Sequence, residues 1–429
     1  MAWGNSCKIH FANLTSAAAT NLRMWAKRVI NFRETAARYF RHRSSTFWFL
    51  TASGLVLCAV LAWRLVLPPG PIDLAVYRAA GGAIIEGSPS LYSPYFGELT
   101  GTLLPFTYPP IAAVLATPLV LLPLAADYVI WTMLGVGLLV AYISRHAGHL
   151  DVARGAGLTF IVAACLWTLP VTDTLALGQL GILLTLGCIA GCTSRHAAVA
   201  MLIGLFAAIK LTPLLFLAYF AITGQWRRLA WASGAVTGLT LVGFLLMPTE
   251  STTYFANLGT SPDRVGDQAF YANQSIGGAL RRFGIDNQFV WALMACTVIT
   301  VGLWLARKWY LKGSLVGGAV VVGLTSVLVS PVSWQHHAVW IIPAAILAYS
   351  YAELHLEKIS ICVLFGISLL RLPLWMSGLP TNEWLSLLGE SLTIVVAGLL
   401  VVLWLIDRRV SGHPAPGVME YVVTQEPKS

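Results

Sequence analysis

The sequence predicts a polytopic α-helical membrane protein. Of its 429 residues, 57% are hydrophobic and only 10% are charged, whereas a soluble domain has about 25% charged residues. Apolar runs of about 20 residues, the length that crosses a hydrocarbon core of about 30 Å, recur from Phe47 to Ile406. These runs lack the alternation of polar and apolar residues that a membrane β-barrel requires. We therefore expect helices, which satisfy their backbone polar groups within the segment.

A basic segment, residues 1–46, precedes the first apolar run, residues 47–67. Such a flank orients the first helix with its N-terminus in the cytoplasm. The segment is too long and too polar for a cleaved signal peptide, so we expect residues 47–67 to be a retained anchor. The net charge of +9 does not indicate a nucleic-acid partner, because the cations are concentrated beside the membrane. Against one acid, Glu34, the segment carries Lys8, Arg23, Lys27, Arg28, Arg33, Arg38, Arg41 and Arg43.

The first half of the remaining chain allows two span counts. Residues 68–107 lie outside if the N-terminus is inside, and residues 74–87 have the mixed pattern of a short amphipathic helix. Between 108 and 224, a count of five spans leaves three arginines outside. If 108–144 is one broken span and 197–223 is two half-spans, those arginines lie inside. We favour this second count because it follows the positive-inside rule.

The second half alternates apolar segments with two kinds of loop. Its short loops are mostly basic, as at 307–312 and 407–409, which places them in the cytoplasm. With about twelve spans in total, we expect one transmembrane catalytic domain over 47–406 and a cytoplasmic tail over 407–429. The expected spans of this half are 229–247, 288–306, 314–329, 338–352, 358–376 and 388–406, and its outer loops are 248–287, 330–337 and 377–387.

Asp73 is the first candidate for a chemical role. It directly follows the first apolar run, in a chain with few acids, and lies beside Tyr77 and Arg78. A carboxylate held at the boundary between membrane and water suits proton abstraction from a polar group of a lipid.

Two further polar residues interrupt apolar segments. Lys210 has more than ten mostly apolar residues on either side, and a lysine at such depth is costly unless it faces a polar cavity or snorkels. It either snorkels at a kink made by Pro213 or supplies a cation for a phosphate or a carboxylate. Gln179, after Gly178, either links helices through hydrogen bonds or binds substrate.

The outer loop 330–337 holds the strongest polar cluster of the chain, which ends in Trp334, Gln335, His336 and His337. Its histidines suit hydrogen bonding to a phosphate or a sugar. Adjacent side chains on a helix lie about 100° apart, so we expect at most one histidine to face the same ligand as Asp73. A zinc site is not predicted there, since the neighbouring sequence offers no third nitrogen or sulfur ligand.

The outer loop 248–287 is rich in polar residues, most of which we expect to be solvated. Arg281 and Arg282 are the exceptions, because an arginine fork next to the membrane can hold a lipid phosphate with two hydrogen bonds. The seven cysteines are scattered and predict neither a disulfide framework nor a metal site.

Taken in order, the polar motifs resemble those of a known family. The motifs are Asp73 with Val76-Tyr77 and Ala79-Ala80, Glu86-Gly87, Leu91-Tyr92, Phe106-Thr107-Tyr108-Pro109-Pro110, Gly178-Gln179, Lys210-Leu211-Thr212-Pro213, Asn273-Gln274-Ser275 and Ser333-Trp334-Gln335-His336-His337. Over residues 50–405 the chain resembles the polyprenyl-phosphate-mannose-dependent mannosyltransferases of glycosyltransferase family 87, which have the membrane GT-C architecture. It is most similar to mycobacterial members that add an α-1,2-linked mannose to phosphatidylinositol tetramannosides.

The resemblance implies a donor, an acceptor and a mechanism. The donor is a β-linked polyprenyl-phosphate-mannose, the acceptor is a phosphatidylinositol mannoside, and the anomeric centre inverts in one displacement. Asp73 is the implied general base, and His337 is the preferred contact of the donor phosphate. The other residues expected at the substrates are His336, Arg281, Arg282, Lys210, Tyr77, Tyr108, Trp334, Gln179 and Asn273. The active site would face the periplasm of the inner membrane, with both termini cytoplasmic.

We expect no cofactor and no metal. The leaving group is a monophosphate, and the chain has no metal-binding pair of the Asp-x-Asp kind at the site. Two other classes of function remain as alternatives. A secondary transporter fits the broken spans, but its ionisable groups would lie near mid-membrane and its two halves would be similar. A lipid flippase or a scaffold requires no base. Within the family, a different lipoglycan acceptor or polyprenyl-phosphate arabinose is the alternative.

Overall fold

The structure is a computed structural model that describes residues 70–87, 90–92, 104–153, 157–258, 266–376 and 387–409. Throughout these ranges the chain is helical and forms no β-strand; one isolated antiparallel bridge joins Asn273 to Trp334. The basic segment 1–46, the expected anchor 47–67 and most of the expected tail lie outside the described residues.

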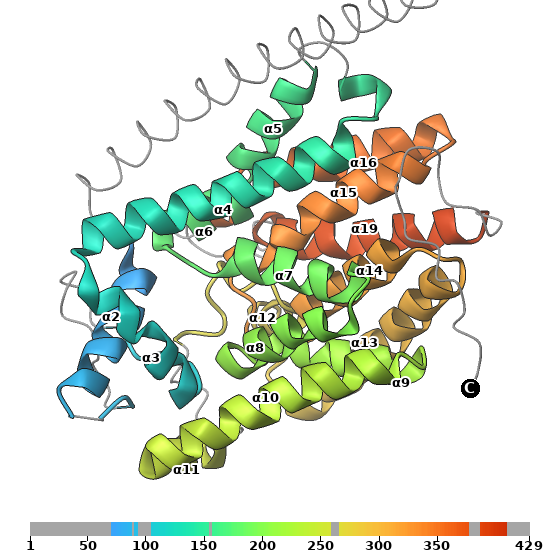
Figure 1. The fold of residues 1–429 in the computed structure, drawn as a ribbon. Helices are drawn as coiled ribbons and strands as arrows, with labels where there is room; N and C mark the ends of the chain where they lie inside the picture. The colour runs from blue at the N-terminus through green and yellow to red at the C-terminus, as the bar shows by residue number, and fades with distance from the viewer. Residues whose placement is uncertain are drawn as a thin grey trace, which may run out of the picture. The chain divides into compact units, whose positions relative to one another are not determined.

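Figure 1 shows the described helices in the order of the chain. They are α2 (Ile72–Ile85), α3 (Pro110–Ala116), η2 (Thr117–Leu121), α4 (Leu124–Ala147), η3 (Asp151–Ala153), α5 (Gly157–Trp167), α6 (Leu169–Leu177), α7 (Gly181–Thr193), η4 (Ala197–Ala200), α8 (Met201–Ile209), η5 (Thr212–Leu214), α9 (Leu215–Ile222), α10 (Trp226–Leu246), α11 (Pro248–Ala256), α12 (Ile276–Arg282), α13 (Gln288–Leu311), α14 (Leu315–Val329), η7 (Gln335–Trp340), α15 (Ile341–Tyr351), α16 (His355–Leu369), α17 (Leu372–Met376) and α19 (Ser391–Asp407).

The chain is a membrane protein. Within the part of the chain that the structure describes, α4, α10 and α13 are each long and apolar enough to cross a bilayer. A fourth crossing results if α5 and α6, which are bent by 60°, form one span. Each of the six spans expected in the second half contains a helix with similar bounds. The count of about twelve spans stays a prediction, because several apolar stretches are divided into shorter helices.

Between residues 108 and 147 the structure differs from the favoured span count. There α4 is long enough to span by itself, and the separate short helices α3 and η2 precede it. Pro123 stands immediately before α4, and proline cannot continue a preceding helix. The structure thus divides residues 108–144 into separate helices, and the span count of this segment stays a prediction. Residues 197–222 do form two short apolar helices on either side of a break at Lys210.

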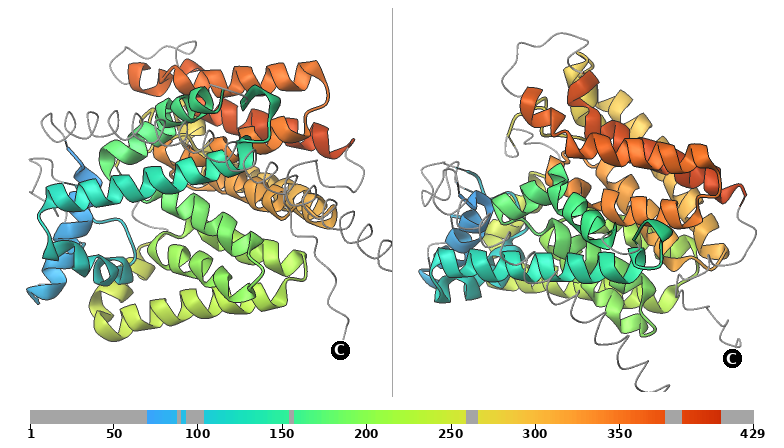
Figure 2. Two further views of the ribbon diagram at one scale, coloured as in Figure 1. Left: turned by 45° about the horizontal axis from the view of Figure 1, so that its top comes forward. Right: turned by 90° about the horizontal axis from the view of Figure 1, so that it is seen from above.

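Four helices pack one on the next in a continuous stack. α4 packs on α7, α7 on α8 and α8 on α10. In Figures 1 and 2, the axes of α4 and α10 are roughly parallel, with α7 and α8 between them, and the chain runs along the two helices in opposite senses. The amphipathic helix α2, expected over 74–87, packs against α3, η2 and the start of α4. Gly87, with a φ of 67°, follows the C-terminus of α2, as glycine commonly does at a helix end.

The core is centred on α14, in which every residue except Val329 is buried. Small residues allow large rings to lie directly on this helix. A Cβ added at Gly323 would overlap the ring of Trp340, and one at Gly318 would overlap the ring of Tyr219. Because Trp340 ends η7, this close packing fixes the short helix that carries the two histidines against the core.

Candidate active site

The polar residues singled out from the sequence lie where helices begin, end or break. Asp73 is in the first turn of α2, after Gly70 and Pro71. Lys210 ends α8 with an extended backbone. Gly178 ends α6 in the left-handed conformation, with a φ of 71°. Inside an apolar bundle, irregular backbone of this kind is tolerated where it is buried in protein or lines a polar cavity.

Asp73 is the centre of a cluster of charged and polar side chains. Burial raises the pKa of its carboxyl above the ordinary value of 3.8. His336 and Lys210 act in the opposite direction through their charges, as does a hydrogen bond from the Gln179 side chain, and Asp173 raises the pKa further. The chain thus brings together five groups from α2, α6, the α6–α7 turn, the α8–η5 break and η7. A carboxylate with a raised pKa is a stronger base than an exposed one.

Beside Asp73, Tyr77, Tyr108 and Gln179 form a closed hydrogen-bond triangle. The Tyr77 hydroxyl lies 2.8 Å from the Tyr108 hydroxyl and donates to Gln179 Oε1 at 2.9 Å. Gln179 Nε2 donates to the Tyr108 hydroxyl at 3.2 Å. The Lys210 ammonium lies 5.7 Å from the centre of the Tyr108 ring. The triangle fixes the Gln179 amide that donates to Asp73, so these residues orient the carboxylate.

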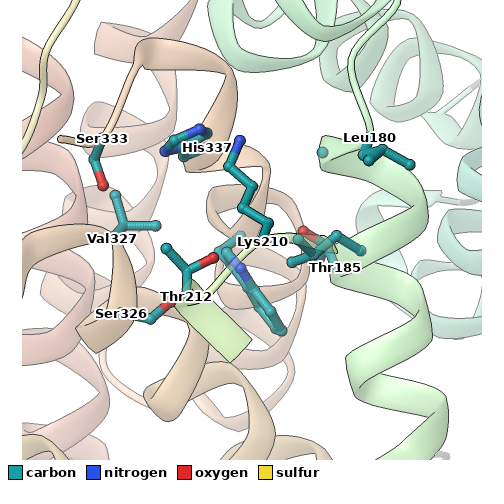
Figure 3. A pocket seen from close by; sticks show the side chains of 11 residues that line it. Leu180, Thr185, Lys210, Thr212, Ser326, Val327, Ser333 and His337 are labelled. Carbon is teal, nitrogen blue, oxygen red and sulfur yellow. The ribbon is translucent and has the colours of Figure 1, made fainter. Parts of the chain in front are cut away.

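A pocket adjoins this cluster and contains the Lys210 and His337 side chains. Figure 3 shows the two reaching toward one another, with Ser333 and Thr212 nearby. Burial lowers the pKa of His337 well below its ordinary value, with smaller contributions from Lys210 and His336. Both ring nitrogens of His337 and the Ser333 hydroxyl are buried and have no hydrogen-bond partner among the described residues. The full lining is Leu180, Gly181, Leu184, Thr185, Lys210, Thr212, Ser326, Val327, Ser333, His337 and Trp340.

Buried polar groups are nearly always hydrogen-bonded in folded proteins. The unpartnered donors and acceptors of this pocket, together with an ammonium group, are therefore suited to an anionic ligand with several oxygens, such as a phosphate monoester or diester.

The two adjacent histidines have different surroundings. Their rings lie 4.7 Å apart at an angle of 81°. His337 lines the pocket with Lys210, whereas His336 Nδ1 lies 3.1 Å from a carboxylate oxygen of Asp173. The charge of His336, rather than that of His337, acts on Asp73.

Four other residues expected at the substrates have structural contacts. Arg282 donates to Glu390 at 2.8 Å and to the Asn273 carbonyl at 2.8 Å, with both charged side chains almost completely buried. Arg281 pairs with an acid of its own loop, Asp286, at 3.3 Å. The Asn273 side chain accepts from the backbone N–H of Ser333 at 2.9 Å, next to its bridge with Trp334. None of these four is among the residues that line the pocket.

Asp173 is a member of the cluster that the sequence analysis did not select. It is the single acid between residues 152 and 249. A lone acid in an apolar segment is a sign of function in membrane proteins, so this isolation could have identified it.

Gly178 controls how closely α2 approaches the cluster. A Cβ at this position would come within 2.6 Å of Leu74 Cβ, next to Asp73. We expect Gly178→Ala to displace α2 and to slow any reaction in which the Asp73 carboxylate takes part, by up to about 100-fold if the carboxylate moves by 1 Å. Gly224→Ala is the matched control, since Gly224 has the same φ of 71° but open space around it. Equal turnover in the two variants would contradict this account.

Comparison with known proteins places this chain in a family. The model of glycosyltransferase family 87 matches residues 106–331. A polyprenol-phosphate-mannose-dependent alpha-(1-2)-phosphatidylinositol mannoside mannosyltransferase of Mycobacterium tuberculosis is 31% identical over 394 residues, which cover 82% of this chain and 90% of the relative. The protein of the same description from Mycolicibacterium smegmatis is 33% identical, over 71% of this chain and 76% of the relative.

A further relative has a name that differs in its acceptor. It is a polyprenol-phosphate-mannose-dependent alpha-(1-2)-phosphatidylinositol pentamannoside mannosyltransferase of Mycolicibacterium smegmatis, 33% identical over 67% of this chain and 72% of its own length. No solved structure matches this chain significantly. The family match covers more than half of the chain and includes Tyr108, Gln179 and Lys210. The chain belongs to glycosyltransferase family 87.

Proposed function

We propose that this protein transfers mannose from polyprenyl-phosphate-mannose to a phosphatidylinositol mannoside and forms an α-1,2 linkage. The observation that carries the proposal is the position of a partly buried carboxylate, Asp73, beside a pocket that holds Lys210 and His337. A base beside a cationic pocket is what a displacement at a sugar phosphate needs. The names of the mycobacterial relatives supply the donor, the linkage and the class of acceptor.

The reaction is a single displacement with inversion. Asp73 removes the proton from the acceptor hydroxyl, whose oxygen forms the bond to the anomeric carbon. The bond between that carbon and the phosphate oxygen breaks, and the electron pair leaves with the polyprenyl phosphate. Lys210 and His337 bind that phosphate and stabilise the negative charge that it gains. Four residues of the expected set have structural roles in this proposal and do not contact the donor: Arg281, Arg282, Asn273 and Trp334.

We further propose the GT-C architecture with about twelve spans in the inner membrane. The termini are cytoplasmic and the Asp73 cluster faces the periplasm, which is supported by the basic segment before the first apolar run and the basic loop 307–312. The acceptor is a tetramannoside, which the transfer converts to a pentamannoside.

Transfer of labelled mannose tests this proposal directly. Purified protein, with EDTA, is incubated with labelled polyprenyl-phosphate-mannose and phosphatidylinositol tetramannoside, and the product is digested with an α-1,2-specific mannosidase. We expect a labelled pentamannoside that the mannosidase converts back to the tetramannoside. Folded protein that transfers mannose to neither a tetramannoside nor a pentamannoside, and that instead uses polyprenyl-phosphate arabinose, would refute the proposed donor.

The pH profile provides a second test. Because Asp73 acts as its carboxylate, kcat/KM falls as the pH drops through its pKa, which burial raises. The acid limb is therefore expected at a higher pH than an exposed aspartate would give. Since the charge of Lys210 lowers this pKa, Lys210→Gln should move the limb to still higher pH. A limb that is unchanged in Lys210→Gln would contradict the assignment of that limb to Asp73.

A further inference from the structure

His336 is held by α6 at two points. Its Nδ1 lies 3.1 Å from the Asp173 carboxylate, and its backbone carbonyl accepts a hydrogen bond from the Thr174 hydroxyl at 3.3 Å. The neighbouring turn fits closely around the same backbone, because a Cβ at Gly181 would come within 2.8 Å of the His336 carbonyl oxygen. The backbone and the ring are thus both fixed by consecutive residues of α6.

The second ring nitrogen of His336 is left for another group. Nε2 is buried and has no hydrogen-bond partner among the described residues. An ionised carboxylate only accepts hydrogen bonds, so the contact with Asp173 places a proton on Nδ1. Nε2 is then the ring nitrogen left to form a hydrogen bond with a hydroxyl group of a sugar, which can both donate and accept.

The surroundings of His336 distinguish its ligand from the donor phosphate. The phosphate pocket is lined by His337 and Lys210, and His336 is not among its lining residues. His336 instead acts on Asp73, the base that receives the proton of the acceptor hydroxyl. A buried, unpartnered nitrogen in the same cluster as this base is a candidate contact for a sugar hydroxyl.

We propose that Asp173 is a positioning residue for the transfer reaction, which holds the His336 ring, with a proton on Nδ1, in the orientation that lets Nε2 form a hydrogen bond with a mannose hydroxyl beside Asp73. The inference rests on the proposed mannosyl transfer and adds a second acid to it. Asp173 contacts no substrate itself. It acts through the ring, as the aspartate of a Ser-His-Asp triad orients its histidine.

Asp173→Asn tests the role, because it keeps the size of the side chain. The amide can donate to Nδ1, so it no longer holds a proton on that nitrogen, and the corresponding change strongly lowers kcat in a triad. We expect kcat to fall at least about tenfold, while the KM of both substrates and the melting temperature stay near those of the wild type. A residue with a merely structural role would change the melting temperature rather than kcat alone.

A double-mutant cycle with His336→Gln shows whether Asp173 acts through His336. We expect Asp173→Asn to cost little further activity once His336 is replaced, since both changes remove one function. The matched controls are Glu353→Gln and His355→Gln, an acid and a histidine that are exposed at the start of α16. Additive losses in the double variant, or full kcat in Asp173→Asn, would overturn the inference.

These outcomes are distinct from a failure of the proposed function. If the wild-type protein itself transferred no mannose, the proposed function would fail and the inference with it. If the wild type transferred mannose and Asp73→Asn did not, full activity of Asp173→Asn would overturn the inference alone. Should Asp173→Asn fold poorly, a comparison of His336→Gln with Thr174→Val separates the attachment of the ring from that of the backbone. A loss of kcat in His336→Gln that exceeds the loss in Thr174→Val supports the inference, and equal losses would overturn it.

Discussion

Replacing Asp73 with asparagine is expected to abolish mannosyl transfer in a protein that remains folded. The amide has nearly the size of the carboxylate and can still accept from the Gln179 side chain, which hydrogen-bonds this position. It cannot take a proton, however, and a positioned general base contributes about 10²–10⁴ to the rate. Turnover of labelled donor in single-turnover conditions measures this loss without interference from product release.

Binding and catalysis are separable for this variant. Because Asp73→Asn keeps the phosphate pocket of Lys210 and His337, the affinity for the donor should change little. Glu353→Gln is the matched acid-to-amide control, since Glu353 is exposed. Wild-type turnover in Asp73→Asn would show that another group removes the proton.

Replacing Lys210 with methionine is expected to lower kcat by about 10²–10³, the loss seen when one preorganised partner of a developing negative charge is removed. Its ammonium lies in the pocket with His337 and beside the Tyr108 ring. Removing the charge weakens the stabilisation of the departing phosphate. It also removes one of the positive charges that favour the ionised form of Asp73.

A matched lysine controls for side-chain size and for the loss of a contact with a tyrosine ring. Lys358 lies 5.6 Å from the centre of the Tyr349 ring, much as Lys210 lies against Tyr108, so Lys358→Met should leave transfer unchanged. Equal kcat in Lys210→Met and Lys358→Met would remove Lys210 from the proposed mechanism.

His337→Ala, in the same pocket, should also lower transfer and should weaken donor binding.

The helices of the second half could be predicted from the sequence because apolar length and basic flanks mark a membrane segment directly. The expected segment 314–329 and α14, Leu315–Val329, nearly coincide. Helix breaks were harder to predict, since a proline such as Pro123 separates helices in one place, while Pro343 lies within the first turn of α15 in another. Tertiary packing decides between these outcomes, and it is not visible in a single sequence.

The candidate site was predicted in part. Gln179 and Lys210 stood out because polar groups in apolar surroundings are costly, Asp73 stood out because it directly follows the first apolar run, and the structure brings the three together. Arg282 stood out as part of an arginine fork next to the membrane, yet Glu390, more than 100 residues later, pairs with it. The partner of a buried charge is set by the fold, so residue type alone could not distinguish the cation of a pocket from the cation of an internal ion pair.

The contact between Gly323 and Trp340 has a consequence for recognising working enzymes among distant relatives. The indole ring needs the missing side chain at position 323, and it ends the short helix on which the histidines are carried. A homologue with every polar residue in place but a bulky side chain at this position would retain the polar groups of the site. It would not hold the two histidines of η7 at the same distances from the other groups. A search for active members should therefore require a small residue at this position, although it carries no polar group of the site.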